Sequence, residues 1–275
     1  MKIDMSHVDI GAMNRAENRN EKRKATATLL TTILLLVIFS SYLTYDFLNP
    51  SKDQAASLES AKLKAALVDQ LSLTFPNETF VDITKSILSK EGYFTDHYSG
   101  REVTVELYRN LPNHYYDIII LRVHSVMTVY RGEPIVALFT SQLHTDAEFV
   151  HERSTGQVGK VKYSADCQEA YFGISQEFVR FSMTGEFAGA LIILMGCEGI
   201  KDNEMAKAFV EKGAKTCIGW NGKVSAPHTD QTTTLLLQYL FTEKQPLEQA
   251  IENAMKEVGS DPAYGSTLVK YPNET

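Results

Sequence analysis

The sequence predicts an α/β domain built on a mostly parallel β-sheet, preceded by one transmembrane helix near the N-terminus. From residue 65 onward, short apolar runs typical of buried strands alternate with segments whose apolar residues recur at helical spacing. This alternation favours a sheet covered by helices on both faces. The apolar segment at residues 28–47 is long enough to cross a hydrocarbon core of about 30 Å. A length of 275 residues fits one sizeable domain with an appended segment.

The sequence divides into four parts. Residues 1–24 are polar, charged and weakly patterned, which predicts a disordered cytoplasmic tail. Residues 25–48 form the predicted transmembrane helix, which meets the membrane through residues 28–47. Residues 49–63 are polar and alanine-rich after an initial proline, and they predict a tether. The α/β domain is expected at residues 64–275.

Basic residues determine the predicted orientation in the membrane. The Lys and Arg residues near the apolar segment are concentrated on its N-terminal side. Those before it are Lys2, Arg15, Arg19, Lys22, Arg23 and Lys24, whereas those just after it are Lys52, Lys62 and Lys64. The positive-inside rule then predicts a single-pass protein with its N-terminus in the cytoplasm and its domain outside.

The elements of the domain follow from apolar periodicity and from turn residues. Pro76 and Asn77 predict the start of the first helix, and Gly92 predicts its end. The expected strands are residues 65–73, 93–98, 116–123, 134–143, 188–196 and 214–220. The expected further helices are residues 103–110, 202–212, 231–242 and 246–258. A functional site is expected where the parallel strands end at their carboxyl termini.

Composition excludes several classes of function. A formal net charge of −7 and a pI near 5.6 argue against a nucleic-acid partner. Cys167, Cys197 and Cys217 are too few for a disulfide framework, and no CxxC pair indicates zinc. The motif HTDAEFVH at residues 144–151 is expected to be a solvated loop and not a metal site. No glycine-rich phosphate loop occurs, so no cofactor is expected.

Two apolar runs end on residues that can perform nucleophilic chemistry. The run 188–196 leads directly to Cys197, and the run 116–123 leads to His124. If both are parallel strands of one sheet, the thiol and the imidazole lie at the same edge. A thiol beside an imidazole is a nucleophile beside its base. The sequence therefore predicts a thiol hydrolase.

The surroundings of these two residues resemble the caspase-like cysteine peptidases. The order of strand and His124, then strand and the motif MGCEG at residues 195–199, is similar to that family, most closely to its CHAT-domain and separase-type members. The segment 206–220 followed by Asp230 is also similar to those members. The resemblance implies a three-layer α/β sandwich and cleavage of peptide or protein substrates by a His124/Cys197 dyad.

The resemblance also implies roles for neighbouring residues. The backbone N–H groups of Ser125 and Cys197 would bind the oxyanion, although the family usually has glycine where Ser125 stands. Asp230 would lie in the primary specificity pocket and pair with a substrate Arg or Lys, and Trp220 would form a wall of that pocket.

Each of these residues also has a structural interpretation. Asp230 is a good N-cap for the helix expected at residues 231–242, and a single tryptophan such as Trp220 is often part of a core. The sequence therefore indicates two candidate functions. The first is a membrane-anchored cysteine endopeptidase, and the second is a catalytically silent domain of the same fold that acts as an anchored binding or scaffolding module.

Overall fold

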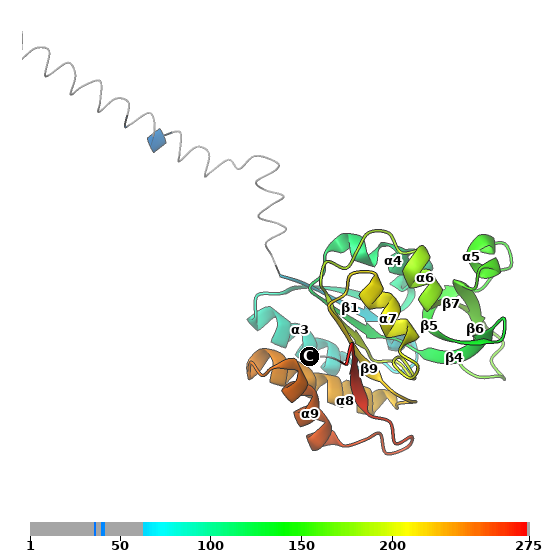
Figure 1. The fold of residues 1–275 in the computed structure, drawn as a ribbon. Helices are drawn as coiled ribbons and strands as arrows, with labels where there is room; N and C mark the ends of the chain where they lie inside the picture. The colour runs from blue at the N-terminus through cyan, green and yellow to red at the C-terminus, as the bar shows by residue number, and fades with distance from the viewer. Residues whose placement is uncertain (1–35, 37–39, 42–62, 274–275) are drawn as a thin grey trace, which may run out of the picture. The chain divides into compact units, whose positions relative to one another are not determined.

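The structure is a computed structural model that describes Leu36, Ser40, Ser41 and residues 63–273 (Figure 1). The chain divides into two units, Met1–Ala61 and Lys62–Thr275. The predicted tail and most of the predicted membrane helix and tether lie outside the described residues, so these remain predictions. Among the residues that are described, no helix has the length and apolar character needed to cross a membrane.

The second unit is built on a six-stranded sheet in the order β10-β9-β8-β3-β1-β2 (Figure 1). All neighbouring strands are parallel except β10, which pairs antiparallel with β9. The sheet consists of β1 (Lys64–Asp69), β2 (Phe94–Ser99), β3 (Ile118–Arg122), β8 (Leu191–Leu194), β9 (Thr216–Trp220) and β10 (Leu268–Tyr271). This confirms the predicted mixed α/β domain with a mostly parallel sheet.

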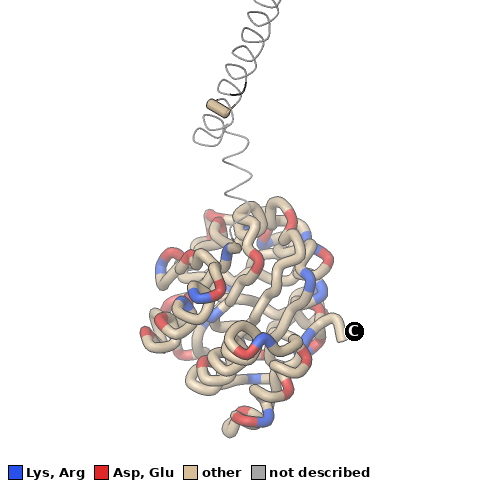
Figure 2. Tube along the Cα trace, turned by 90° about the vertical axis from the view of Figure 1, so that its left-hand side faces the viewer, with Lys and Arg blue, Asp and Glu red and all other residues tan. Residues whose placement is uncertain are grey.

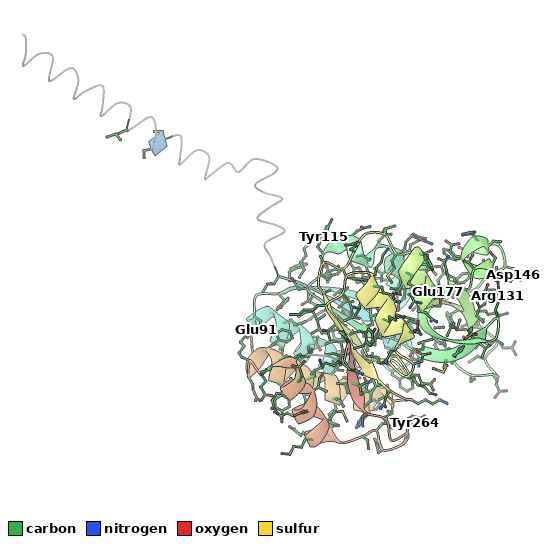
Figure 3. All side chains as sticks on the ribbon, viewed as in Figure 1. Glu91, Tyr115, Arg131, Asp146, Glu177 and Tyr264 are labelled. Atoms are coloured by element: carbon green, nitrogen blue, oxygen red, sulfur yellow. The ribbon has the colours of Figure 1, made fainter. Side chains whose placement is uncertain are left out.

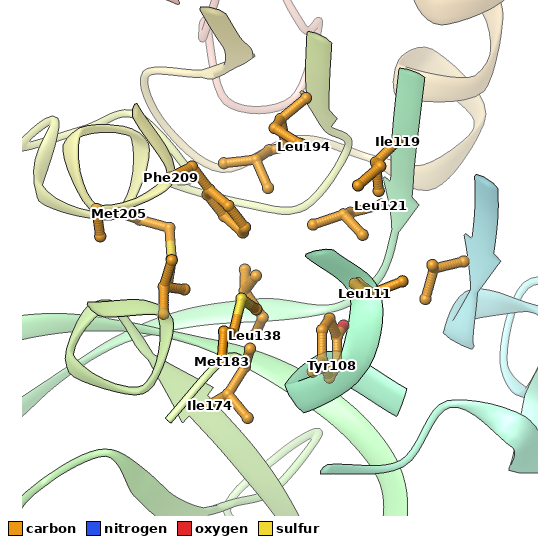
Figure 4. Packing of buried hydrophobic residues seen from close by; sticks show 14 of the residues in the cluster. Tyr108, Leu111, Ile119, Leu121, Leu138, Ile174, Met183, Leu194, Met205 and Phe209 are labelled. Carbon is orange, nitrogen blue, oxygen red and sulfur yellow. The ribbon is translucent and has the colours of Figure 1, made fainter. Parts of the chain in front are cut away.

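Helices cover both faces of this sheet. Successive residues of a strand point to opposite faces, so each strand contributes side chains to two cores. On β3, Ile120 packs in the core with α3 (Glu78–Lys90), α8 (Ala226–Leu237) and α9 (Leu247–Val258). The next residue, Leu121, packs on the other side, where α4 (Val105–Asn110), α6 (Gln176–Phe181) and α7 (Glu204–Glu211) lie. Figure 4 shows Leu121 and Leu194 of the sheet facing Phe209 of α7 in this second core.

A second sheet, which the sequence patterns did not predict, lies beside these helices. It has four antiparallel strands in the order β4-β5-β7-β6. The strands are β4 (Ser125–Tyr130), β5 (Glu133–Leu143), β6 (Val158–Val161) and β7 (Tyr171–Ser175), and the short helix α5 (Val150–Ser154) precedes β6. The strand predicted at 134–143 therefore exists as β5, but it belongs to this sheet and not to the parallel one.

Two element boundaries differ from expectation in ways that affect the site. The strand expected at 65–73 ends at Asp69, because the Asp69 carboxylate accepts a hydrogen bond from the Ser72 backbone and turns the chain into the 3-10 helix η1 (Gln70–Leu73). The helix expected at 231–242 already begins at Ala226, with Pro227 in its first turn, where proline is tolerated.

Three further short helical turns occur among the described residues. They comprise the 3-10 helices η2 (Gly100–Glu102) and η3 (Leu111–His114) and a π-helical turn, η4 (Gln238–Thr242), that continues α8. Charged residues of both signs are interspersed over the face of the domain in Figure 2.

Candidate active site

His124 and Cys197 lie at the same edge of the parallel sheet. Strands β3 and β8 are parallel neighbours, with Leu121 opposite Leu194. His124 follows the end of β3, and Cys197 follows the end of β8. The chain passes from β1 outward to β2 and then returns across β1 to β3. The topological switch point, where open α/β sheets bind ligands, therefore lies between β1 and β3, at the strand that precedes His124.

Both side chains line one cavity of about 320 Å³. Its walls come from the chain after β1, from the ends of β3 and β8, and from the start of α8. Tyr264, on the connection between α9 and β10, completes the lining and is labelled in Figure 3. The other lining residues are Leu71, Phe75, Val123, Met195, Gly196, Val224, Ser225, Ala226, Pro227 and Thr229.

Hydrogen bonds hold His124 in one orientation. Its Nε2 lies 2.8 Å from Thr74 Oγ1, and that hydroxyl in turn lies 3.5 Å from the Leu71 carbonyl. If the hydroxyl proton points to Leu71, the Thr74 oxygen accepts from Nε2–H. In that tautomer the proton is on Nε2, and Nδ1 is the basic nitrogen. The His124 backbone N–H donates to Gln70 Oε1 at 3.0 Å.

Aromatic side chains surround the imidazole. The ring centroid of His124 lies 4.9 Å from that of Tyr163, 5.7 Å from that of Phe139 and 5.9 Å from that of Phe75. Tyr163 follows β6, so the second sheet contributes to the site, and its hydroxyl accepts from Gln70 at 2.7 Å. Burial, followed by the positive charge of Arg122, lowers the pKa of His124 to about 4.

His124 is expected to make the domain less stable in acid. Its folded pKa of about 4 lies below its ordinary value of 6.5, so between these values only the unfolded chain binds the extra proton. The free energy of unfolding should fall by on the order of 2–3 kcal/mol as the pH decreases from about 6.5 to about 4. Urea denaturation across this pH range measures the effect. His124→Gln should weaken the pH dependence and the exposed control His151→Gln should not; an unchanged dependence in His124→Gln contradicts the assignment.

Cys197 is held by the backbone of the loop before α8. Its thiol lies 3.5 Å from the Val224 carbonyl as donor, and 3.4 Å from the Val224 N–H as acceptor. Burial raises the pKa of the Cys197 thiol. At neutral pH the unliganded site therefore contains a neutral thiol and a neutral imidazole, and it requires proton transfer to generate a thiolate.

The turn that carries Cys197 packs tightly against the start of β4. A Cβ atom at Gly196 would lie 2.7 Å from the Val123 carbonyl and would also clash with the Ser125 hydroxyl, so only glycine fits there. The Ser125 hydroxyl donates to the Cys197 carbonyl. Glu198 has a positive φ of 59°, and its N–H donates to Gly222 at 2.7 Å. These contacts fix the backbone on both sides of Cys197.

The two predicted oxyanion donors are placed differently. In the part of the chain that the structure describes, the Cys197 N–H donates to no other group and remains available to an oxyanion. Ser125 begins β4, beside the cavity, and is nearly buried. Its side chain holds the turn at Cys197 through the Cys197 carbonyl. The oxyanion roles of both residues remain predictions.

Asp230 does not occupy the predicted specificity pocket as a free carboxylate, and it is not a helix N-cap. Arg122 Nε donates to its Oδ1 at 2.8 Å and Arg122 Nη2 donates to its Oδ2 at 2.8 Å, while Asn77 Nδ2 also donates to Oδ2 at 2.8 Å. Asp230 lies inside α8, whose N-cap is Ser225. It borders a neighbouring cavity together with Arg122, and not the cavity of His124 and Cys197.

Trp220 is a core residue that supports the cavity from behind. It is fully buried at the end of β9, and its Nε1 donates to Thr229 Oγ1 at 2.9 Å. Thr229 lines the cavity, whereas Trp220 does not. The predicted role as a pocket wall is therefore indirect.

The sequence patterns did not identify Thr74, Gln70 or Tyr163 as site residues. Gln70 directly follows β1, and this position at a strand end is the one signal that could have been used. Thr74 and Tyr163 lie in connections without a motif, and their contacts with His124 arise from the tertiary fold. Among the described residues, no group of three or more His, Cys, Asp or Glu side chains could hold a metal ion.

No protein-family model and no curated protein sequence matches this chain. Among solved structures, the chain is similar to the Arg-specific cysteine proteinase gingipain R, with a TM-score of 0.46 and 10% sequence identity. The similarity covers 72% of this chain but only 43% of the proteinase chain. A similarity of this degree assigns neither an activity nor a specificity to the chain.

Proposed function

We propose that the chain is a cysteine endopeptidase of the caspase-like type, with Cys197 as nucleophile and His124 as general base. The observation that carries this proposal is that the two residues follow neighbouring parallel strands and line one cavity. The fixed nucleophile turn and the unpaired Cys197 N–H also support it. A peptide or protein is the proposed substrate, and no cofactor is required for the reaction.

The proposed reaction proceeds by acyl transfer. As the Cys197 sulfur attacks the scissile carbonyl carbon, Nδ1 of His124 accepts the thiol proton, so the thiol and imidazole need not be charged beforehand. The carbonyl oxygen becomes an oxyanion, which the Cys197 N–H would stabilise by about 3 kcal/mol. The imidazolium then donates its proton to the leaving amine, and the C–N bond breaks. Water hydrolyses the resulting thioester, with His124 again as base.

A direct experiment tests this proposal. The purified full-length chain is incubated with a mixture of unstructured peptides, and the new termini are identified by mass spectrometry. Cleavage at defined positions that disappears in Cys197→Ala supports the endopeptidase. Cleavage that persists in this variant contradicts it.

Thr74→Val is expected to reduce kcat about five- to thirtyfold with little change in KM. Valine has a similar shape but no hydroxyl, so the Nε2 proton of His124 loses its acceptor, at a cost of about 1–2 kcal/mol. Thr74→Ser is the matched control, because it retains the hydroxyl and should retain most of the activity. Steady-state kinetics on a cleaved peptide measures both variants. A wild-type kcat in Thr74→Val would show that Thr74 does not position the base.

A catalytically silent binding domain is the second candidate function. Three observations favour it: the thiol is bonded to Val224, the imidazole to Thr74, and burial holds both in their uncharged forms. The peptide-cleavage experiment distinguishes the two functions.

We further propose that residues 28–47 anchor the chain in a membrane, with the domain on the extracytoplasmic side. The apolar length of this segment and the basic residues before it support this location. Protease added to intact cells should remove residues 64–275 and leave the N-terminal tail protected. After permeabilisation, the tail should also be degraded. A domain that survives in intact cells and is lost only after permeabilisation reverses the orientation.

A further inference from the structure

We infer that the cavity beside Cys197 binds an uncharged, apolar side chain of the substrate, at the residue whose carbonyl is attacked. This inference rests on the proposed function and specifies its substrate class. It replaces the expectation from the sequence that Asp230 would select Arg or Lys.

Most of the side chains that line the cavity are apolar. Leu71, Val123, Met195 and Val224 are all nearly or fully buried, and Phe75 lies at the more exposed rim. An apolar cavity of about 150 Å³ is enough to hold benzene. The volume of about 320 Å³ is therefore sufficient for a branched aliphatic or aromatic side chain.

The two buried or half-buried hydroxyl groups in the lining, those of Thr229 and Ser225, already have partners, and the third belongs to the exposed Tyr264. Thr229 Oγ1 accepts from the Trp220 indole, and Ser225 Oγ donates to Asp261 Oδ2 at 2.7 Å. A charged or strongly polar substrate group in this cavity would lose its hydration without gaining a matching partner there. Such an unpaired polar group typically costs several kcal/mol.

Asp230 and Asp261, two buried acidic residues near the cavity, already have hydrogen-bond partners on both carboxylate oxygens. Asp230 is paired with Arg122 through both oxygens. Asp261 accepts from the Ser225 N–H and hydroxyl through Oδ2, and from the Ala263 and Tyr264 N–H groups through Oδ1, at 2.7–2.9 Å. Neither carboxylate is available to a substrate guanidinium.

Acidic substrate residues have no better match. Lys223 is adjacent to Val224 in the sequence, but it is exposed and is not among the described residues that line the cavity. Arg122 is completely buried, and it donates to Asp69, Asp230 and the Phe75 carbonyl. Burial of a Leu or Phe side chain, by contrast, contributes favourable apolar transfer free energy without an unpaired charge.

A set of peptidyl electrophiles that differ only at this one position tests the inference. The full-length chain is treated with otherwise identical probes carrying Leu, Phe, Arg or Asp, and the rate of Cys197 modification is measured by mass spectrometry. We expect Leu and Phe to react at least tenfold faster than Arg and Asp. Equal or faster reaction of the Arg or Asp probe overturns the inference.

A binding measurement separates this inference from the proposed function. Product-like peptides ending in Leu or Arg are titrated into the Cys197→Ala variant, which cannot react. Tighter binding of the Leu peptide supports the cavity assignment. If the Leu peptide binds more tightly but no electrophile labels the wild-type chain, only the proposed peptidase activity is refuted. Tighter binding of the Arg peptide overturns the cavity assignment.

Ala226→Asp provides a gain-of-function test. Ala226 lines the cavity and is the first residue of α8, where the helix dipole favours a negative charge, so the variant should fold. It should increase labelling by the Arg probe relative to the Leu probe. The charge-matched control Ala147→Asp, on an exposed loop, should leave the ratio unchanged. An unchanged ratio in Ala226→Asp contradicts the location of the pocket.

Discussion

Arg122→Met is expected to lower the free energy of unfolding by about 3–5 kcal/mol. Arg122 is completely buried, and its guanidinium pairs with Asp69 at 2.7 Å and with Asp230 at 2.8 Å. It also lies over the Phe80 ring, 5.6 Å from the centroid. Methionine would leave two buried carboxylates without their shared cation, and uncompensated buried charges are among the most destabilising changes. Urea denaturation at neutral pH measures the loss.

Arg180→Met is the matched control for Arg122→Met. Arg180 also pairs with carboxylates, those of Glu177, Glu204 and Glu211, but these acids are much more exposed than Asp69 and Asp230. Exposed ion pairs contribute about 1 kcal/mol or less. An equal loss of unfolding free energy in the two variants would show that the ion pairs of Arg122 with Asp69 and Asp230 do not stabilise the fold. Asp230 would then again be a candidate specificity residue.

Cys197→Ala is expected to reduce peptide hydrolysis at least about 10³-fold, because removal of a catalytic nucleophile leaves only binding and oxyanion stabilisation. The melting temperature should change little, since Cys197 is only partly buried and makes two weak hydrogen bonds to Val224. The control is Cys167→Ala, in the loop between β6 and β7, which should retain full activity. Loss of activity in both variants, or in neither, would exclude Cys197 as the nucleophile.

The central strands of the parallel sheet could be predicted from the sequence because they are buried on both faces. Residues 116–123 and 188–196 read as continuous apolar runs, and each contains the strand that the structure places there, β3 and β8. The antiparallel sheet could not be predicted in the same way. Its β4 is largely half-exposed, so the sequence gives neither a continuous apolar run nor a clear alternation.

The location of His124 and Cys197 at one edge of the sheet could be predicted for the same reason. Residues that follow neighbouring parallel strands must lie at one edge, so the sequence pattern was sufficient to place both residues there. The role of Asp230 could not be predicted, because its partner Arg122 lies on β3, far away in the sequence. A buried arginine inside an apolar strand is a signal that an acidic partner is required, and here that partner proved to be the proposed specificity residue.

The site of covalent modification by a peptidyl electrophile shows whether His124 and Cys197 act together. The full-length chain, its His124→Ala variant and its Cys197→Ala variant are treated with a Leu-containing probe, and the adduct is located by peptide mapping. We expect an adduct on Cys197 in the wild-type chain, strongly slowed labelling in His124→Ala, and no adduct in Cys197→Ala. An adduct on Cys167 in place of Cys197, or labelling of Cys197 that does not depend on His124, would contradict the His124/Cys197 dyad.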